Sequence, residues 1–216
     1  SLMTMTTVIG YNLLDEHIEE KNNVNTFYHG DCLFVMRHDI LPESIDLIYL
    51  DPPFFTGKIQ KGKWQPGAME ISFEDSKRFW SEKAEVMRGK APSWLQHIAI
   101  NRSDFASYLW YMMERLQACH KVLKKAGSIY LHCDYRASHY LRMVMDEIFT
   151  PDRFINEIIW YYKTGGTSKH WLGRKHGTIL LYSKGAAYKF NPQKEKSYLT
   201  HRYGFSNIQI HEDNGG

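Results

Sequence analysis

Hydrophobic and polar positions alternate along this chain with two periods, and the alternation predicts strands and helices in turn. A nearly continuous apolar run at 45–50 predicts a buried strand, and residues 128–132 predict another. Short β-like residues at 26–29 precede a helix-like stretch near 32–39. This order of elements favours a sheet whose parallel strands are joined by right-handed crossovers.

Two longer helices are predicted in the middle of the chain. The first is expected from Asp104, the candidate N-cap, to about Lys124, and Gly127 is expected to end it. Its apolar face follows helical spacing and consists of Tyr108, Met112, Leu116 and Val122. The second helix is expected over 136–149.

The remaining segments complete the predicted organisation. Two alternating stretches at 156–163 and 177–183 predict strands joined by a glycine-rich, basic connection. The long interruption at 55–103, rich in glycine and proline, is typical of a functional loop or lid. Residues 1–25 have weak periodicity and are expected to form a loosely packed arm. The whole pattern predicts an α/β fold.

Composition narrows the class of protein. With 216 residues, of which 43% are hydrophobic, the chain can bury the core of one domain. No run approaches the length of a bilayer span, and positions 1–20 lack the features of a signal peptide. Three cysteines without zinc-type spacing suit a reducing, cytoplasmic location. No metal site is expected, because no histidine pair has a recognised metal spacing on one helix.

Charge is unevenly distributed, although the formal net charge is only +3. Residues 1–50 hold eight acidic and two basic side chains, whereas residues 163–202 hold nine Lys or Arg and a single acid, Glu195. Such asymmetry is typical of a surface that binds a polyanion, and equally of a solvated basic surface. Charge alone leaves these two interpretations open.

The most informative motif, Asp51-Pro52-Pro53-Phe54, directly follows the strand at 45–50. The exocyclic amine of a nucleobase is a poor nucleophile, because its lone pair is delocalised into the ring. The Asp51 carboxylate and the Pro52 carbonyl can accept its two hydrogens, and the fixed φ of proline holds that carbonyl still. A carboxylate also stabilises the cationic nitrogen that develops during methyl transfer.

Phe54 adds a flat ring to this motif. A base that has left the duplex can stack on such a ring, which is worth about 1–3 kcal/mol per base. The alternative interpretation is a tight turn in which Asp51 serves only as a cap. The position of the motif after a buried strand favours the first interpretation, a pocket for an amine-bearing base.

A second, weaker motif is His29-Gly30-Asp31-Cys32-Leu33, with Asp31 twenty positions before Asp51. Asp31 is expected at the carboxyl end of a strand, where doubly wound sheets bind ligands. Its carboxylate can accept a hydrogen bond from an adenine amine or a ribose hydroxyl of a cofactor, and Cys32 can offer its backbone N–H. A helix N-cap at Asp31 is an equal alternative.

Taken together, "GDCLFVM…LPESIDLIYLDPPFFTGK" resembles the amino-terminal half of S-adenosylmethionine-dependent DNA amino-methyltransferases. The match is to the group whose target-base half precedes its methionine-binding half, and it covers most of residues 26–191. It implies a Rossmann-like sheet, mainly parallel with an antiparallel hairpin, and S-adenosyl-L-methionine bound by Asp31, Cys32, Leu33 and Asp51. It also implies double-stranded DNA as substrate and a restriction endonuclease subunit as partner in a bacterial or archaeal cell.

Within that family, an aspartate at position 51 implies methylation of adenine N6, while cytosine N4 and RNA amino methylation stay open. The resemblance also implies a second aromatic wall opposite Phe54, for which Trp160 is the candidate; a core tryptophan is the alternative. His132, at the carboxyl edge of its strand, is either a site residue or a hydrogen-bonded structural histidine. The predicted phosphate contacts are Lys58, Lys61, Lys63, Lys169, Arg174 and Lys175.

The family's Phe-x-Gly-x-Gly turn, which cradles the methionine part of the cofactor, is not found in this sequence. The sheet is therefore expected to be incomplete, with a partial catalytic core at 26–191 and the start of a recognition or linker segment at 192–216. Weak or absent cofactor binding and no activity are expected from the chain alone. A nucleic-acid-binding fragment without catalysis is the alternative from another functional class.

Overall fold

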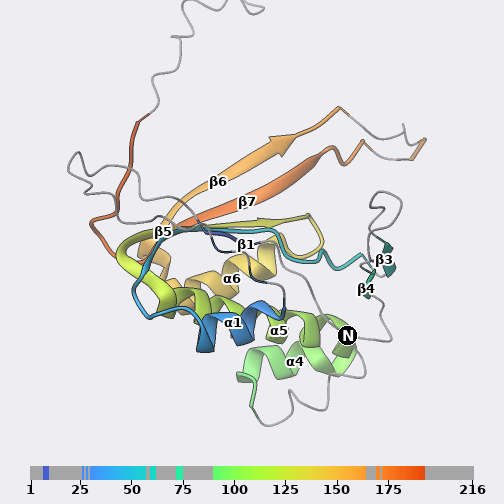
Figure 1. Cartoon of the computed structure of the whole chain (residues 1–216). Coiled ribbons are helices and arrows are strands. Elements are labelled where there is room, and N and C mark those ends of the chain that lie inside the picture. Colours follow the sequence, from blue (N-terminus) through green and yellow to red (C-terminus); the bar gives the residue numbers. More distant parts are fainter. Residues whose placement is uncertain are drawn as a thin grey trace, which may run out of the picture.

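The computed structural model describes residues 7–9, 26, 28, 30–56, 59–61, 72–74, 90–163, 169–170 and 172–192. Its main sheet contains five strands in the order β1-β2-β5-β7-β6 (Figure 1). They are β1 (Thr7–Ile9), β2 (Ile45–Leu50), β5 (Leu123–Cys133), β6 (Phe154–Tyr161) and β7 (His176–Ser183). A separate two-stranded sheet pairs β3 (Ile59–Lys61) with β4 (Ser72–Glu74).

Strand directions confirm the predicted mixed sheet. β2 and β5 are parallel, and β7 is antiparallel to both β5 and β6. It follows that β2, β5 and β6 run in the same direction, while β7 is inserted between two of them in reverse. β1 is antiparallel to β2 at the other edge. The α/β class, the shared direction of the main strands and the antiparallel β6–β7 hairpin all agree with the sequence prediction.

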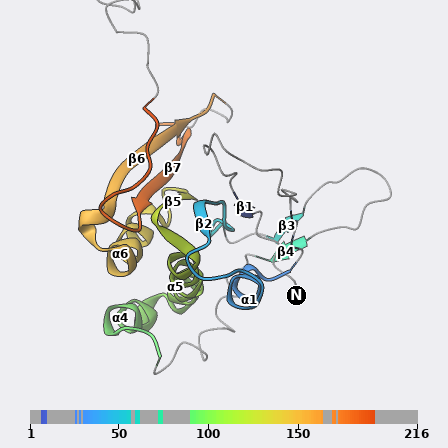
Figure 2. The ribbon, with the colours of Figure 1, turned by 60° about the vertical axis from the view of Figure 1, so that its left-hand side comes forward.

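The helices are α1 (Cys32–His38), α4 (Ser93–Asn101), α5 (Ser103–Val122) and α6 (Ser138–Phe149), with a 3₁₀ turn η1 (Pro151–Arg153). They lie on one side of the sheet, and α5 packs against α1, α4 and α6 (Figures 1 and 2). The predicted apolar face of α5 is buried in full. This long helix therefore forms the centre of the core, between the sheet and the outer helix α4.

Three local predictions are wrong. Asp104 is not the N-cap, because α5 begins at Ser103. The Asp104 carboxylate instead accepts the Phe105 N–H in the first turn, where a negative charge interacts favourably with the helix dipole. Gly127 does not end α5. The helix ends at Val122, and Leu123 adopts an extended backbone that leads directly into β5. The second predicted strand is consequently longer than 128–132.

The third wrong prediction concerns the interruption at 55–103, which is not all loop. Residues 93–101 form α4, which packs on α5 and buries Leu95 completely. The expected arm at 1–25 contributes the short strand β1 to the sheet edge. Of the strand expected at 26–29, residues 26 and 28 are described and neither belongs to a strand. Residues 27 and 29, with most of that arm, lie outside the described residues.

Candidate active site

The register of two parallel strands brings Asp51 next to His132. Leu50 of β2 lies opposite Leu131 of β5, so the next residue of each strand reaches the same carboxyl edge of the sheet. The Asp51 Oδ1 atom lies 3.1 Å from His132 Nδ1, within hydrogen-bond distance. The Asp51 side chain is 52% exposed, whereas that of His132 is 20% exposed. The carboxylate is thus anchored on one side and open on the other.

Adjacent aromatic side chains of the motif point to opposite environments. Phe54 is half-buried, and its ring meets the His132 ring edge-on, with the centroids 5.0 Å apart. Phe55 is buried against Phe105 and Tyr108. Pro52 is also buried. Phe55 and Pro52 therefore hold the segment on the core, while Asp51 and Phe54 stay accessible from outside it.

The charge of Asp51 affects the pKa of a tyrosine in the preceding strand, β2. The pKa of Tyr49 is raised, first by burial of the phenol and then by the Asp51 carboxylate. More than half of the Asp51 side chain is exposed, so a ligand can reach its oxygens. The carboxylate can therefore accept hydrogen bonds from an incoming amine.

Asp31 has two partners that fix its carboxylate. Oδ1 accepts the Leu33 N–H at 2.7 Å, which makes Asp31 the N-cap of α1. Oδ2 accepts a hydrogen bond from Arg115 Nη2 at 2.6 Å. The N-cap interpretation of Asp31 is therefore confirmed, and the Leu33 N–H is committed to that cap. Because the Asp31 side chain is 43% exposed, it keeps further acceptor capacity towards a ligand.

Arg115 is a site residue that the sequence analysis missed. Its side chain is only 4% exposed, and its guanidinium lies 3.3 Å from the centroid of the Tyr111 ring. The available signal was its spacing, because position 115 is seven residues after Tyr108, on the apolar face of α5. An arginine on such a face requires an internal acidic partner. Nearby, burial raises the pKa of the Cys32 thiol to about 11.

The β6–β7 hairpin carries exposed aromatic residues. Trp160 is 61% exposed and lies opposite Gly177 in the β6–β7 pairing, so the alternative of a core tryptophan is wrong. The next residue, Tyr161, is 66% exposed. Figure 1 shows this hairpin extending beyond the helical layer. Trp160 is therefore accessible, as a stacking side chain must be.

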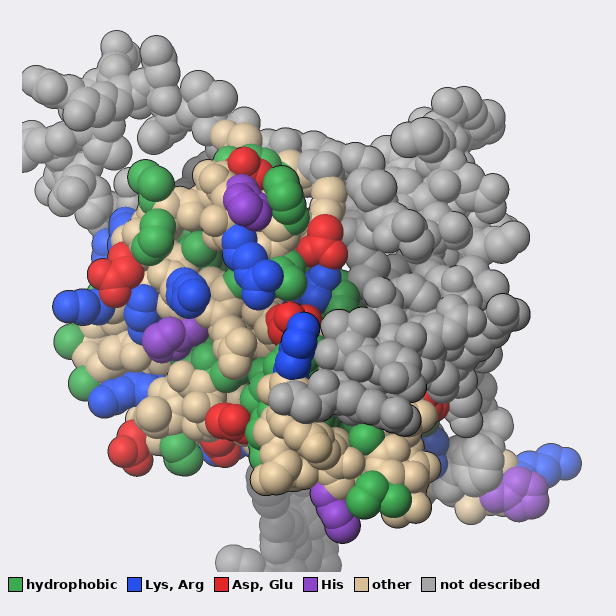
Figure 3. Space-filling view, turned by 90° about the horizontal axis from the view of Figure 1, so that it is seen from below, with side chains coloured by type: hydrophobic (Ala, Val, Ile, Leu, Met, Phe, Trp, Pro, Cys, Tyr) green, Lys and Arg blue, Asp and Glu red, His purple; other side chains and the backbone are tan. Residues whose placement is uncertain are grey.

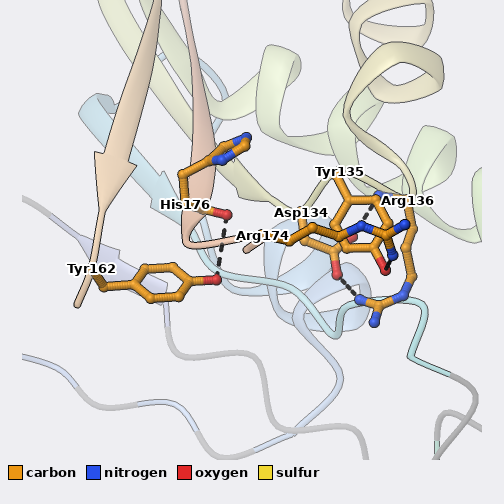
Figure 4. Close-up of polar contacts among 6 residues, drawn as sticks. All are labelled: Asp134, Tyr135, Arg136, Tyr162, Arg174 and His176. Atoms are coloured by element: carbon orange, nitrogen blue, oxygen red, sulfur yellow. Dashed lines mark hydrogen bonds and ion pairs between the residues drawn. The ribbon is translucent and has the colours of Figure 1, made fainter. Parts of the chain in front are cut away.

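Arg174, one of the predicted phosphate contacts, lies beside Tyr135 (Figure 4). Its Nη1 donates to the Tyr135 hydroxyl at 2.7 Å, and its guanidinium lies 4.5 Å from the ring centroid. Arg136 approaches the same ring at 4.8 Å while it pairs with Asp134. These cations therefore gather just beyond the carboxyl end of β5, the strand that ends next to His132 and Asp51.

The other predicted phosphate contacts are described only in part. Lys169 is exposed and Lys175 is half-buried, both in the connection between β6 and β7. Lys58 and Lys63 lie outside the described residues, as does the side chain of Lys61 in β3. The predictions for these three lysines stay predictions.

A cavity of about 620 Å³ lies on the helical side, between α1, α5 and α6. It contains none of the predicted site residues; its lining includes Met36, Ile40, Glu114 and Glu147. Figure 3 views this side and shows acidic and basic side chains interspersed over the described part. A polyanion site is therefore not indicated here. Within the described ranges, no helix is long and apolar enough for a bilayer, and no acidic, His or Cys cluster could hold a metal.

Comparison with known proteins places this geometry in a family. The model of a DNA methylase family matches residues 45–212, which include β2, the Asp51 motif, β5 and the β6–β7 hairpin. The chain belongs to this DNA methylase family. The Asp51 motif and the strands β2, β5, β6 and β7 therefore lie within the part of the chain that matches the family.

Several proteins similar to this chain are named as restriction-modification subunits or DNA methyltransferases. The chain is 25% identical over 172 residues to the type III restriction-modification enzyme EcoP15I Mod subunit of Escherichia coli, which covers 77% of this chain and 25% of that protein. It is 27% identical over 173 residues to the DNA adenine methyltransferase YhdJ of Escherichia coli, covering 79% and 45%. The solved PvuII DNA methyltransferase (cytosine-N4-specific) is 15% identical, with a TM-score of 0.45, over 74% of this chain and 49% of that one. The chain spans about a quarter of the length of the Mod subunit that it matches.

Proposed function

We propose that this chain is the base-binding part of a DNA methyltransferase that transfers a methyl group from S-adenosyl-L-methionine to N6 of a flipped adenine. One observation supports the proposal most: a half-exposed Asp51 carboxylate and a half-buried Phe54 ring both contact His132, just beyond the carboxyl end of β2. A tight turn with a capping aspartate would not need the ring to remain accessible.

The proposed mechanism assigns separate tasks to these residues. Phe54 stacks on the extruded base, which must leave the duplex before its amine can be approached. Asp51 and the Pro52 carbonyl each accept one hydrogen of the amine, which frees the nitrogen lone pair. As the nitrogen becomes cationic, the Asp51 carboxylate stabilises the charge, and its exposure lets the released proton pass to solvent. Pro53 stiffens the segment that carries both acceptors.

The residues at Asp31 fit the proposed cofactor. Arg115 and the N-cap hold the Asp31 carboxylate in place, and its exposed part can still accept a hydrogen bond from an amine or hydroxyl. Asp31, with the Cys32 backbone N–H, Leu33 and Asp51, would hold S-adenosyl-L-methionine. When bound, this cofactor supplies the electrophilic methyl group. The buried Cys32 thiol, whose pKa is raised to about 11 by desolvation, stays protonated and uncharged beside it.

DNA is the proposed macromolecular substrate. Arg174, Lys169 and Lys175 would contact backbone phosphates, as would Lys58, Lys61 and Lys63, and Trp160 would form the second wall of the base pocket. The concentration of arginines around Tyr135 supports this assignment, because it lies near the end of the strand that reaches Asp51. Phosphate contacts of this kind position the protein without reading the sequence.

The names of the relatives support a proposal for the partner and the location. Because one relative is the Mod subunit of a type III restriction-modification enzyme, we propose a restriction subunit as partner. A bacterial or archaeal cytoplasm is the proposed location, and three cysteines that are not joined by disulfides agree with a reducing compartment. Adenine rather than cytosine is proposed from Asp51 and from the name of the YhdJ relative.

The test uses the complete translation product of the reading frame that encodes residues 1–216. It is incubated with duplex DNA and S-adenosyl-L-methionine, and the modified nucleosides are identified by mass spectrometry. We expect N6-methyladenine, reduced about 10²-fold or more by Asp51→Ala, because a preorganised acceptor is lost. Asp39→Ala, which removes an exposed aspartate after α1, is the matched control and should leave the rate unchanged.

Other outcomes would replace this proposal. N4-methylcytosine would assign the enzyme to cytosine, and methylated RNA would change the substrate class. DNA binding without any methylation by the complete product would favour a binding module. Full activity of Asp51→Ala would remove Asp51 from the mechanism.

A further inference from the structure

His132 contacts three other residues at the centre of the candidate site. Its Nδ1 lies 3.1 Å from Asp51 Oδ1, and its ring meets the Phe54 ring edge-on at 5.0 Å. The third contact is with Gly177, since a Cβ at that position would lie 2.5 Å from His132 Nε2. Three segments that are far apart in the sequence thus meet at one imidazole.

We propose that His132 is a positioning residue that holds the Asp51 carboxylate in its acceptor orientation. This inference rests on the proposed function and adds to it a residue and a hydrogen bond. A neutral imidazole that donates from Nδ1 to Asp51 Oδ1 stops rotation of the carboxylate and directs Oδ2 towards the amine of the base. The proton is held on Nδ1, and Nε2 faces the backbone of Gly177.

Gly177 is part of the same device. Any side chain there would displace the imidazole, because its Cβ would lie far inside contact distance of Nε2. Gly177 is also the partner of Trp160 in the β6–β7 pairing. Gly177 therefore leaves room for the His132 ring and is paired with Trp160, the proposed second wall of the base pocket.

The contact with Phe54 gives His132 a second effect. An edge-on aromatic contact fixes the angle of the Phe54 ring, and with it the direction from which a base can stack on that ring. Loss of the imidazole would loosen both the acceptor and the stacking surface. Misplacement of reacting groups by about 1 Å can cost about 10²-fold in rate.

Two substitutions separate positioning from mere packing. His132→Asn keeps a donor where Nδ1 lies, whereas His132→Gln places its amide where Nε2 lies and leaves Asp51 without that donor. We expect His132→Gln to lower the single-turnover methylation rate roughly 10- to 100-fold. His132→Asn should stay within about threefold of the unsubstituted protein, and Gly177→Ala should behave like His132→Gln. The affinity for DNA should change little in all three.

The coupling to Asp51 provides a further check. In an Asp51→Ala background, His132→Gln should cause no additional loss, because the acceptor of the His132 hydrogen bond is already gone. Equal damage from the His132→Asn and His132→Gln variants, or full additivity with Asp51→Ala, would overturn the proposal and leave His132 a packing residue.

A spectroscopic measurement keeps this inference separate from the proposed function. The ring nitrogens of His132 are observed by ¹⁵N NMR in the complete product at neutral pH. We expect the tautomer protonated on Nδ1, and we expect Asp51→Ala to shift it towards the Nε2–H form. If the protein methylates nothing but this result holds, the hydrogen bond stands and only the proposed reaction fails. An Nδ1 nitrogen that carries no proton in the unsubstituted protein would overturn the inference.

Discussion

At the scale of single residues, the Asp31–Arg115 pair joins the start of α1 to the middle of α5. The guanidinium is almost completely buried, whereas the carboxylate is about half exposed. A buried charge without its partner is costly, while an exposed carboxylate can be hydrated. Loss of the Asp31 charge should therefore destabilise the fold more than loss of the Arg115 charge.

We expect Asp31→Asn to lower the free energy of unfolding by about 3 kcal/mol, because it leaves the Arg115 guanidinium buried without its counter-charge. Arg115→Met removes the buried charge itself and should cost less. Asp31→Asn combined with Arg115→Met should be more stable than Asp31→Asn alone. Urea denaturation measures all three, and an Asp31→Asn variant as stable as the original protein would contradict the argument.

At the scale of elements, the packing of β5 against β2 depends on a glycine inside a strand. A Cβ at Gly127 would lie 2.9 Å from Leu123 Cδ2 and 3.0 Å from the Asp46 carbonyl oxygen. The β2–β5 register shifts between Ile45 and Leu47 at this level. The glycine thus permits close approach of two backbones near the irregularity, rather than ending a helix.

Gly127→Ala is expected to destabilise the protein by about 1–3 kcal/mol, because backbone atoms must move to accommodate the methyl group. Gly30→Ala is the control, since a Cβ at Gly30 would meet nothing within 4 Å. Thermal unfolding compares the two variants. Equal melting temperatures would show that β5 can shift without cost.

At the scale of the whole molecule, the core contains all three cysteines, which are buried and not joined by disulfides. Burial raises the pKa of the Cys32 thiol to about 11 and that of Cys133 to about 12, and it also raises the pKa of Cys119. Each thiol is therefore held protonated in the folded state above the pH at which it would ionise in the unfolded chain, roughly 8.5.

Two results follow from this burial. At pH 8 the folded protein should react slowly with a disulfide reagent, and all three thiols should react quickly in denaturant. The thiols contribute stability that is fully present below about pH 8.5, because the unfolded chain then holds the same protons. That contribution should fall as the pH rises from there towards 11. Fast labelling of the folded protein, or no loss of stability in alkali, would contradict this.

The sequence by itself determined β2 and the apolar face of α5, and it singled out Asp51 and Phe54, which the structure leaves at least partly exposed. Those features depend on local periodicity and on residues adjacent in the chain, as does the N-cap at Asp31. The sequence predicted the boundaries of α5 less accurately than its apolar face. A helix can pass into a strand without a glycine cap, because the sheet can take up the backbone hydrogen bonds.

Only the tertiary structure decided which distant residues meet. Arg115 lies 84 positions from Asp31, and His132 lies 81 positions from Asp51. Gly127 leaves room for the backbone of Asp46, and Gly177 leaves room for the His132 ring. Both neighbours are far away in the sequence. Local pattern sets which side chains are buried and which strand ends are polar, but strand register and helix packing select their partners, because those contacts exist only after the sheet has formed.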